Sequence, residues 1–322
     1  MLRPIQGSNV AALTTVAVMI FALGIMAAGT TFAQEQDCNG RWCADISKQE
    51  HPMKRPVIVF RHSATIRLTH WVGVVCVTLL LLSGLQIFNA HPALYLGRAS
   101  DFAHPIASIG VVQEETRQIG VTEIFGHSFN TTGFLGLSGP SNDDKHAFPS
   151  RLTLPGYQDL ATGRRWHFFF AWLLVIDRFT YLIYGIASGH VWRDLIPSID
   201  QLRHIGNSIL DHLHLRFPRG DEANRYNVLQ QLSYLAVLFI IAPLLILTGL
   251  TMSPGLDAAF PFLTNALGGR QTARTMHFIC AFTLVVFAII HVVMVLLSGV
   301  WNNLRSMITG WYAIRLESHR HG

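Results

Sequence analysis

Charged residues are scarce in this sequence, and so is cysteine. Only 13% of the 322 residues are charged, 50% are hydrophobic, and there are four cysteines. A disordered chain needs low hydrophobicity with high charge, and a small disulfide-built domain needs more cysteine, so both classes are excluded. The composition also argues against a soluble globular protein and favours a membrane protein.

Several sequence motifs are missing as well. There is no C-x-x-C-H motif for covalent haem attachment, no P-loop, no dinucleotide fingerprint, no nucleophile elbow and no zincin motif. The net charge of +5 could suggest nucleic acid, but no basic run with interleaved aromatic residues is present. Lys and Arg lie instead between apolar stretches. We therefore expect the lipid bilayer as a partner, and no nucleic acid.

Five apolar runs are long enough to cross a bilayer, which takes about 20 residues for a core of about 30 Å. The first follows Arg3 and ends before a small-x-small site at Ala33, so residues 1–33 are predicted to be a signal peptide or an extra N-terminal span. A linker is expected over 34–59 and a tail over 313–322. The other runs predict an all-α, multi-pass membrane protein, a four-helix bundle with spans at about 68–90, 166–188, 232–252 and 276–297.

The distribution of Lys and Arg predicts the sidedness of the spans. Fourteen of these residues lie in the segment before the first body span, the segment before the third and the C-terminal tail, against eight in the two other loops. Because basic residues are retained in the cytoplasm, the long loop 91–165 is expected outside. Cleavage after Ala33 would reverse every span, whereas an uncut first segment would preserve this orientation. Both alternatives stay open.

Four of the sixteen histidines lie in or beside the predicted spans: His70, His167, His277 and His291. An ionisable side chain in a bilayer usually has a functional partner, although a hydrogen bond across helices is the alternative for each one. His277 and His291 are fourteen residues apart. This spacing puts them on roughly the same face of one helix, about 21 Å apart, where they can act as two stacked ligands.

Each of these two histidines has a potential partner at a matching depth. A six-coordinate haem needs a second axial ligand from another helix. His70 begins its span on the side where the last helix ends, so it can face His291. His167 opens the next span from the opposite side, so it can face His277. The spacing therefore predicts two haem sites, each with two histidine ligands.

These residues resemble a known family. Arg67-Leu-Thr-His70-Trp71, Arg165-Trp166-His167-Phe168, and His277 with His291 are similar to the bacterial di-haem b-type cytochromes, the membrane subunits of nickel-iron hydrogenase, formate dehydrogenase and thiosulfate reductase. The likeness covers about 60–312 and is strongest to the thiosulfate-reductase-type anchors, through the run from Arg165 to Trp172 and Ser188-Gly189-His190. It implies two b haems, a peripheral molybdopterin or iron-sulfur oxidoreductase subunit, electron exchange with membrane quinone, and a place in the bacterial inner membrane.

Charged residues near the spans are further candidates. Asp177 and Arg178 lie in the middle of a span, and at about 100° apart on the helix they are not expected simply to pair face to face. Arg178 could hold a haem propionate or reach a quinone-linked network, and the alternative is an ion pair between helices that only specifies packing. Arg61, Arg67 and Arg165 could hold propionates or anchor the chain at the headgroups.

The segments outside the spans carry four more predictions. His190, Trp192 and Arg193 are candidates for a quinone site or belong to an interfacial patch. Leu202 to Leu215 is predicted to lie on the membrane surface. Loop 91–165 is too long for a connector and is expected to form a cap over the outer haem and a docking face, or else to be a flexible loop. Cys38 and Cys43 could form a disulfide only outside the cytoplasm.

The leading hypothesis is an electron-transfer subunit whose partner carries substrate catalysis. Its rival is a haem-free transporter or anchor in which the span histidines and Asp177 form a proton relay. A relay needs polar groups along one path, whereas here one helix offers two ligands and two others offer one each. There is also no inverted repeat of the transporter kind. A third possibility is a cytochrome that oxidises quinol without a peripheral subunit.

Overall fold

The computed structural model describes residues 57–206, apart from 140 and 204, and residues 228–314. The predicted signal or first span, Cys38 with Cys43, and most of the segment from Leu202 to Leu215 lie outside these residues. The chain divides into two compact units. The described residues of one are 57–67 and 295–314, and those of the other, which carries most of the bundle, are 68–206 and 228–294.

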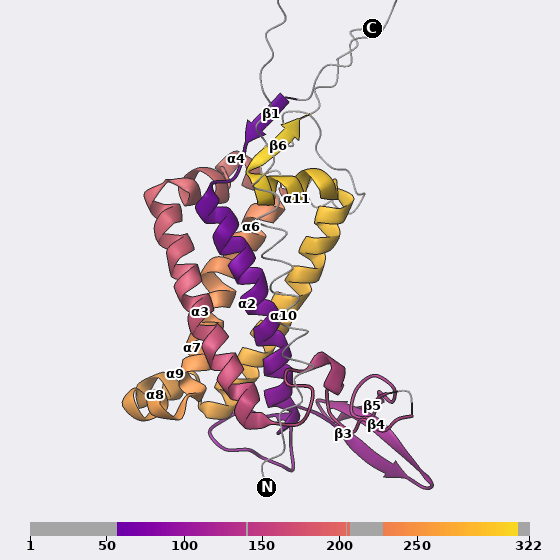
Figure 1. Cartoon of the computed structure of the whole chain (residues 1–322). Coiled ribbons are helices and arrows are strands. Elements are labelled where there is room, and N and C mark those ends of the chain that lie inside the picture. The colour runs from indigo at the N-terminus through magenta and orange to yellow at the C-terminus, as the bar shows by residue number, and fades with distance from the viewer. Residues whose placement is uncertain (1–56, 140, 204, 207–227, 315–322) are drawn as a thin grey trace, which may run out of the picture. The chain divides into compact units, whose positions relative to one another are not determined.

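Four helical segments among the described residues are long and apolar enough to cross a membrane. They are α2 (Ala64–Asn89), α3 (Leu160–Ala187), the segment Val228–Met252 and α10 (Arg270–Leu297). The third segment consists of α6 (Val228–Ala236), the π-helical turn η4 (Val237–Ile241) and α7 (Ala242–Met252). The predicted fold class, a helical membrane protein with four spans, is confirmed (Figure 1).

The helices begin before the predicted spans do. Helix α2 starts at Ala64 rather than residue 68, and α3 starts at Leu160 rather than residue 166. Asp159 caps α3, because its carboxylate accepts a hydrogen bond from the backbone N–H of Thr162 at 3.0 Å. Apolar residues mark where a membrane-facing surface begins, while the cap marks where the helix begins. The extra turns bring Arg67, Arg164 and Arg165 into the helices.

The long loop between α2 and α3 is a folded cap, residues 91–159. It contains a four-stranded antiparallel sheet in the order β2 (Ala93–Leu94), β3 (Ala107–Glu114), β4 (Arg117–Ile124) and β5 (His127–Asn130). A 3-10 turn, η1 (Ser150–Leu152), follows. The expected cap is thus a structured element rather than a flexible connector. Its strands were not predicted, because at most eight residues of alternating burial give a much weaker signal than a span.

Polar side chains at the ends of α2 and α10 hold the cap in place. The Asn89 amide donates to the Phe148 carbonyl at 2.9 Å and accepts from the Phe148 N–H at 2.8 Å. Arg274 donates to the carbonyls of His91 and Ala93. Below these bonds lies a small apolar core of Phe88, Leu94, Ile109, Ala147 and Phe148. The cap is therefore fixed at the end of the bundle where α10 begins (Figure 1).

Short helices follow two of the spans. The chain continues from α7 into α8 (Pro254–Ala259) and α9 (Pro261–Ala266), each of which begins with a proline. The π-helical turn η2 (Val191–Leu195) and α4 (Ile199–Arg203) follow α3. Proline suits the first turn of a helix because that position needs no N–H donor.

The smaller unit joins the two ends of the described chain. Strand β1 (Val57–Phe60) pairs antiparallel with β6 (Trp311–Ile314), which follows α11 (Val300–Thr309). The rings of Phe60 and Trp311 meet edge to face with centres 5.3 Å apart. Arg67 donates to the carbonyl of Ile308. These contacts connect the start of α2 with α11 in this unit.

Candidate functional site

Two pairs of histidines face each other across helices at two levels. The ring centres of His167 on α3 and His277 on α10 are 6.3 Å apart, with the ring planes at 63°. Those of His70 on α2 and His291 on α10 are 6.4 Å apart, at 59°. The two pairs are separated by fourteen residues of α10, or about 21 Å along its axis. The structure therefore brings together the partners that matching depth predicts.

The spacing within each pair fits one metal ion between the rings. An imidazole nitrogen binds a transition metal at about 2.0 Å and lies about 1 Å from its own ring centre, so two ligands on opposite sides of one ion have ring centres about 6 Å apart. A direct hydrogen bond between two imidazoles, with about 2.9 Å between nitrogens, would place the centres about 5 Å apart. The observed separations match the first arrangement.

Hydrogen bonds decide which nitrogen of His277 can bind a metal. Its Nδ1 lies 3.1 Å from the carbonyl oxygen of Leu245 and 3.0 Å from the hydroxyl of Thr248. Because a carbonyl can only accept, Nδ1 carries the proton. The hydroxyl of Thr248 donates in turn to the Leu244 carbonyl at 2.6 Å. The lone pair of Nε2 is then left for a metal, with the ring orientation fixed from behind.

His167 is held in the same way. Its Nδ1 lies 3.1 Å from the Ser83 hydroxyl, which donates to the Leu79 carbonyl at 2.7 Å. Since the serine proton points to Leu79, the hydroxyl oxygen accepts from the ring N–H. His167 and His277 thus present the same tautomer, with a free Nε2 on each ring.

His70 and His291 lie in an aromatic setting instead. The ring of His291 stacks on Phe287, with centres 5.9 Å apart and planes at 19°, and meets Tyr234 edge to face at 6.2 Å. His70 meets Trp71 edge to face at 5.3 Å. Neither imidazole has a hydrogen bond to another of the residues that the structure describes. The separation of this pair suits a metal ion between the rings. Among the described residues, however, nothing orients these rings in the way that the hydrogen bonds on Nδ1 orient His167 and His277.

A partly buried ion pair lies against α2 beside His70. Arg178 donates from Nε to the carboxylate of Asp177 at 3.0 Å and from Nη2 to the Thr69 carbonyl at 2.6 Å. Gly73 leaves the space, because a Cβ there would overlap the guanidinium. The prediction that Asp177 and Arg178 do not pair was wrong, since the long arginine side chain bends back along its own helix. The roles of Arg178 toward a propionate or quinone stay predictions.

A comparison of sequence families agrees with this geometry. The family described as Prokaryotic cytochrome b561 matches residues 61–310, which include all four histidines. The chain belongs to this family. A cytochrome b561-family protein is a membrane electron-transport subunit, and the family implies haem b. The predicted resemblance to b-type cytochromes is confirmed at this level, as is the location in a prokaryotic membrane, while the particular likeness to thiosulfate reductase anchors stays a prediction.

One curated relative matches most of this cytochrome b561-family chain. It comes from Azospira oryzae and carries the name of a proposed protein-methionine-sulfoxide reductase subunit, YedZ1. The two sequences are 31% identical over 251 residues, which make up 77% of this chain and 96% of the relative. No solved structure matches the chain.

The haem b implied by the family fits the residues present. Each histidine pair has the separation of two axial ligands, and the hydrogen bonds on Nδ1 leave Nε2 of His167 and His277 free to bind iron. Aromatic side chains flank the His70–His291 pair, and the apolar helices α2 and α7 carry the hydroxyls that contact the His167–His277 pair. The donor set of each pair would therefore suit a haem held by two histidines.

The other arginines predicted to face a haem have protein partners. The guanidinium of Arg67 is bonded to the Ile308 carbonyl in the smaller unit. Arg165 is exposed and donates to the Thr162 hydroxyl at 3.0 Å, and Arg61 lies over the Tyr312 ring at 4.7 Å. None of these contacts tests a role with propionates, which stays a prediction for each residue.

His190 lies just after α3, where the turn η2 begins. Its ring meets Tyr181 edge to face with centres 6.5 Å apart, and the guanidinium of Arg178 lies 5.8 Å from the same tyrosine ring. Trp192 is exposed. The side chain of Arg193 lies outside what the structure describes. His190, Tyr181 and Arg178 thus follow one another from the helix end into the span.

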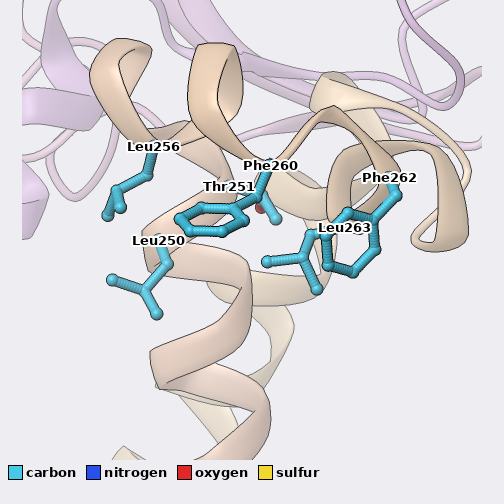
Figure 2. Close-up of a pocket in the computed structure, with 6 residues that line it drawn as sticks. All are labelled: Leu250, Thr251, Leu256, Phe260, Phe262 and Leu263. Carbon is cyan, nitrogen blue, oxygen red and sulfur yellow. The ribbon is translucent and has the colours of Figure 1, made fainter.

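An apolar pocket lies in the segment that follows the third span (Figure 2). It has a volume of about 290 Å³ and lies between the end of α7 and the short helices α8 and α9. Its one polar side chain, Thr251, donates its hydroxyl to the Thr248 carbonyl at 2.8 Å. The pocket therefore offers no free polar side chain for a quinone carbonyl. It is lined by Leu250, Thr251, Leu256, Phe260, Phe262 and Leu263.

The residues that support His167 and His277 were not predicted, because small hydroxyl residues and glycines in a span carry no charge. A signal is present in the sequence, since residues 79–85 read Leu-Leu-Leu-Leu-Ser-Gly-Leu and residues 244–250 read Leu-Leu-Ile-Leu-Thr-Gly-Leu. Arg274 was not predicted either, because its contacts with the cap depend on a folded loop.

Proposed function

We propose that this protein is a di-haem electron-transfer subunit that connects a peripheral oxidoreductase with membrane quinone. The observation that carries the proposal is the presence of two imidazole pairs, at 6.3 Å and 6.4 Å, on two levels of one bundle. One haem b would lie between His167 and His277, and the second between His70 and His291. Bound haem b supplies one-electron oxidation and reduction without substrate chemistry of its own.

The chain's own residues bind and orient these groups. The Nε2 atoms of His167 and His277 would hold one haem iron, while their Nδ1 protons are held by protein oxygens. His70 and His291 would hold the second among aromatic rings. The apolar walls of the bundle exclude water, which keeps the dielectric low and makes nearby charges effective in setting redox potentials.

Quinone exchange is proposed at the end of α3. A quinone site needs a donor for the carbonyl oxygen and a route for a proton. His190 carries an imidazole and lies just after α3, and Tyr181 and Arg178 continue from it toward the His70 level. His190 would donate to the quinone carbonyl and exchange a proton with water at the membrane surface.

The peripheral subunit is proposed to dock on the cap. The cap is folded, lies at the end of the bundle nearest the His167–His277 pair, and exposes Phe102, Phe125 and Phe134 at 76%, 76% and 69% of their surfaces. A molybdopterin or iron-sulfur subunit would carry the substrate chemistry. The name of the Azospira oryzae relative favours a protein-methionine-sulfoxide reductase as that subunit.

The proton-relay alternative has less support. Transfer from ring to ring would require imidazole nitrogens within hydrogen-bonding distance, and ring centres 6.3 Å apart are too far for a direct bond. The protonated Nδ1 atoms of His167 and His277 are bonded to groups within the protein, not to each other.

Reduction of the purified protein by a short-chain quinol tests the proposal. We expect rapid appearance of the ferrous b-type spectrum, and a rate at least about tenfold lower in His190→Ala, because loss of a general acid or base typically costs that much or more. His127→Ala, on the exposed strand β5, is the matched control. Equal rates in the wild type and His190→Ala would contradict the proposed quinone site.

A second measurement tests the partner. Purification of the tagged full-length chain from its native membrane should retain a peripheral oxidoreductase subunit, and removal of the aromatic side chains of the cap (Phe102, Phe125 and Phe134 to Ala) should release it while both haems remain. Haem-loaded protein that reacts with quinol but never retains a second chain would favour a stand-alone quinol-oxidising cytochrome.

A further inference from the structure

A seven-residue sequence occurs twice in the bundle, on α2 and on α7. Residues 79–85 and 244–250 differ only at Leu81, where the second copy has Ile246, and at Ser83, where it has Thr248. Both differences keep the chemical character of the side chain. Each copy lies against a different histidine of the same pair, Ser83 against His167 and Thr248 against His277.

The hydrogen bonds of the two copies match atom by atom. In each copy the hydroxyl donates to the carbonyl four residues earlier, Leu79 at 2.7 Å and Leu244 at 2.6 Å. The hydroxyl oxygen then lies within 3.1 Å or 3.0 Å of the histidine Nδ1. A hydroxyl whose proton is already directed to a carbonyl is a better acceptor for the imidazole N–H, since linked hydrogen bonds polarise one another.

The glycine that follows each hydroxyl lets the imidazole approach the helix. A Cβ at Gly84 would lie 3.3 Å from Cε1 of His167, and one at Gly249 would lie 3.4 Å from Cε1 of His277. Both separations are at or below the tight end of van der Waals contact. The Ser-Gly and Thr-Gly pairs therefore fix the rings twice, by a hydrogen bond to Nδ1 and by contact with the backbone.

The second histidine pair has no equivalent. His70 and His291 are surrounded by Trp71, Phe287 and Tyr234, without hydrogen bonds to the described part of the chain. The protein thus treats the two sites differently. If the Ser-Gly and Thr-Gly pairs served only to pack helices, their hydroxyls would have no reason to contact the two histidines of one pair.

From this arrangement we propose that Ser83 and Thr248 are positioning residues that lower the redox potential of the haem held by His167 and His277. The inference rests on the proposed function, because it assumes that these histidines ligate iron. An oxygen that accepts the Nδ1 proton increases the electron density of the imidazole, and a more basic axial ligand favours ferric over ferrous iron. Both ligands of one iron receive this support, so the two effects act in the same direction.

Four substitutions distinguish the effect of each hydroxyl group from the effect of side-chain volume. Thr248→Val keeps the shape of the side chain and removes the hydroxyl, whereas Thr248→Ser keeps the hydroxyl and removes the methyl group. Ser83→Ala removes the other hydroxyl, and Ser83→Thr keeps it. Thr248→Ser and Ser83→Thr introduce the residue that the protein already has at the matching position of the repeat. We therefore expect these two variants to fold.

The readouts are the haem content of the full-length protein, the two midpoint potentials from an optical redox titration, and the electron paramagnetic resonance of the ferric haems, which reports axial ligation. We expect Thr248→Val and Ser83→Ala each to raise the same one of the two potentials, and the double variant to raise it further. Thr248→Ser and Ser83→Thr should keep the wild-type values. The haem whose midpoint potential shifts should be the haem that is lost in His277→Ala.

Each outcome decides the inference. Unchanged potentials in Thr248→Val and Ser83→Ala at full haem content would overturn it, as would a shift of the other centre. Loss of one haem from Thr248→Val but not from Thr248→Ser would support the inference. Equal loss from both variants would show that side-chain volume matters rather than the hydroxyl, and would overturn the inference. A wild type with fewer than two haems would instead contradict the proposed function, which keeps the two failures distinguishable.

Discussion

Asp177 and Arg178, neighbours on α3, form a partly buried ion pair in which the guanidinium also donates to the Thr69 carbonyl of α2. The contact joins two spans next to His70. Loss of either partner would leave an unpaired charge inside the bundle, whereas loss of both would not.

A double-mutant cycle distinguishes a structural role of this pair from a functional one. Breaking a buried pair typically costs about 3–5 kcal/mol, while replacing both members with apolar residues is often neutral. We expect Asp177→Leu and Arg178→Leu each to lower the thermal stability of the purified protein strongly, and the double variant to recover most of it. If the double variant keeps both haems but is no longer reduced by quinol, the pair also serves the quinone reaction. Additive losses of stability would contradict the pairing.

Gly84→Ala and Gly249→Ala should disturb the His167–His277 centre without weakening the helices. Alanine normally stabilises a helix interior by about 1 kcal/mol relative to glycine. Here the added Cβ would press on the imidazole ring at 3.3 Å or 3.4 Å. We expect altered ligand-field signals or loss of one haem at unchanged helix content by circular dichroism. Gly255→Ala, where an added Cβ meets nothing within 4 Å, is the control and should keep both haems.

Arg274→Gln should loosen the cap. Arg274 donates to the carbonyls of His91 and Ala93 and lies over the Phe88 ring with 5.7 Å to its centre. Hydrogen bonds from a charged donor contribute about 1.5–3 kcal/mol each, so protection of cap amides should fall at least about tenfold. Hydrogen exchange read by mass spectrometry measures this directly.

Arg117→Gln provides the comparison for that measurement. Arg117 pairs with Glu114 at the exposed tip of the β3–β4 hairpin, and a surface pair of this kind contributes little. Exchange in the cap should therefore stay near the wild-type rate. Equal exchange in Arg274→Gln and the wild type would show that the arginine does not anchor the cap.

The stability of the cap should depend on pH through Asp144. Burial acts to raise the pKa of Asp144, but hydrogen bonds from Ser150 and His146 outweigh it and hold the pKa at about 2. The ordinary value is about 3.9. A carboxyl group whose pKa is lowered by folding stabilises the folded form above its ordinary pKa, and this contribution is lost as the pH falls from about 4 to about 2.

Asp144→Asn removes that contribution. We expect faster cap exchange than in the wild type at neutral pH, and a difference in susceptibility to pepsin that disappears between about pH 4 and pH 2. The exposed neighbour Asp143 gives the control, since Asp143→Asn should behave like the wild type. A difference that grows as the pH falls would have the wrong sign for this account.

The spans and the histidine pairs could be predicted because their signals are local or periodic. A membrane-crossing helix needs a long apolar run, and fourteen residues on a helix return His291 to roughly the face of His277. The sheet of the cap gives no comparable signal, since strands such as β3 owe their position to pairing with β4 rather than to a long apolar run.

Other parts of the site depend on how side chains bend and approach one another. Helical angle alone argued against an Asp177–Arg178 contact, because it ignores the reach of a long arginine side chain. Ser83 and Thr248 could have been found from the repeated seven-residue sequence. Their role depends on which imidazole lies opposite each hydroxyl. That information belongs to the packing of helices distant in sequence.

The haem content of the full-length protein and its histidine variants tests the central claim most directly. We predict two b-type haems per chain in the wild type, one in each of His70→Ala, His167→Ala, His277→Ala and His291→Ala, and none in His277→Ala/His291→Ala. His70→Ala/His291→Ala and His167→Ala/His277→Ala should each retain one haem, with different spectra. Folded wild-type protein without haem, or variants that lose haem in a different pairing, would contradict the account.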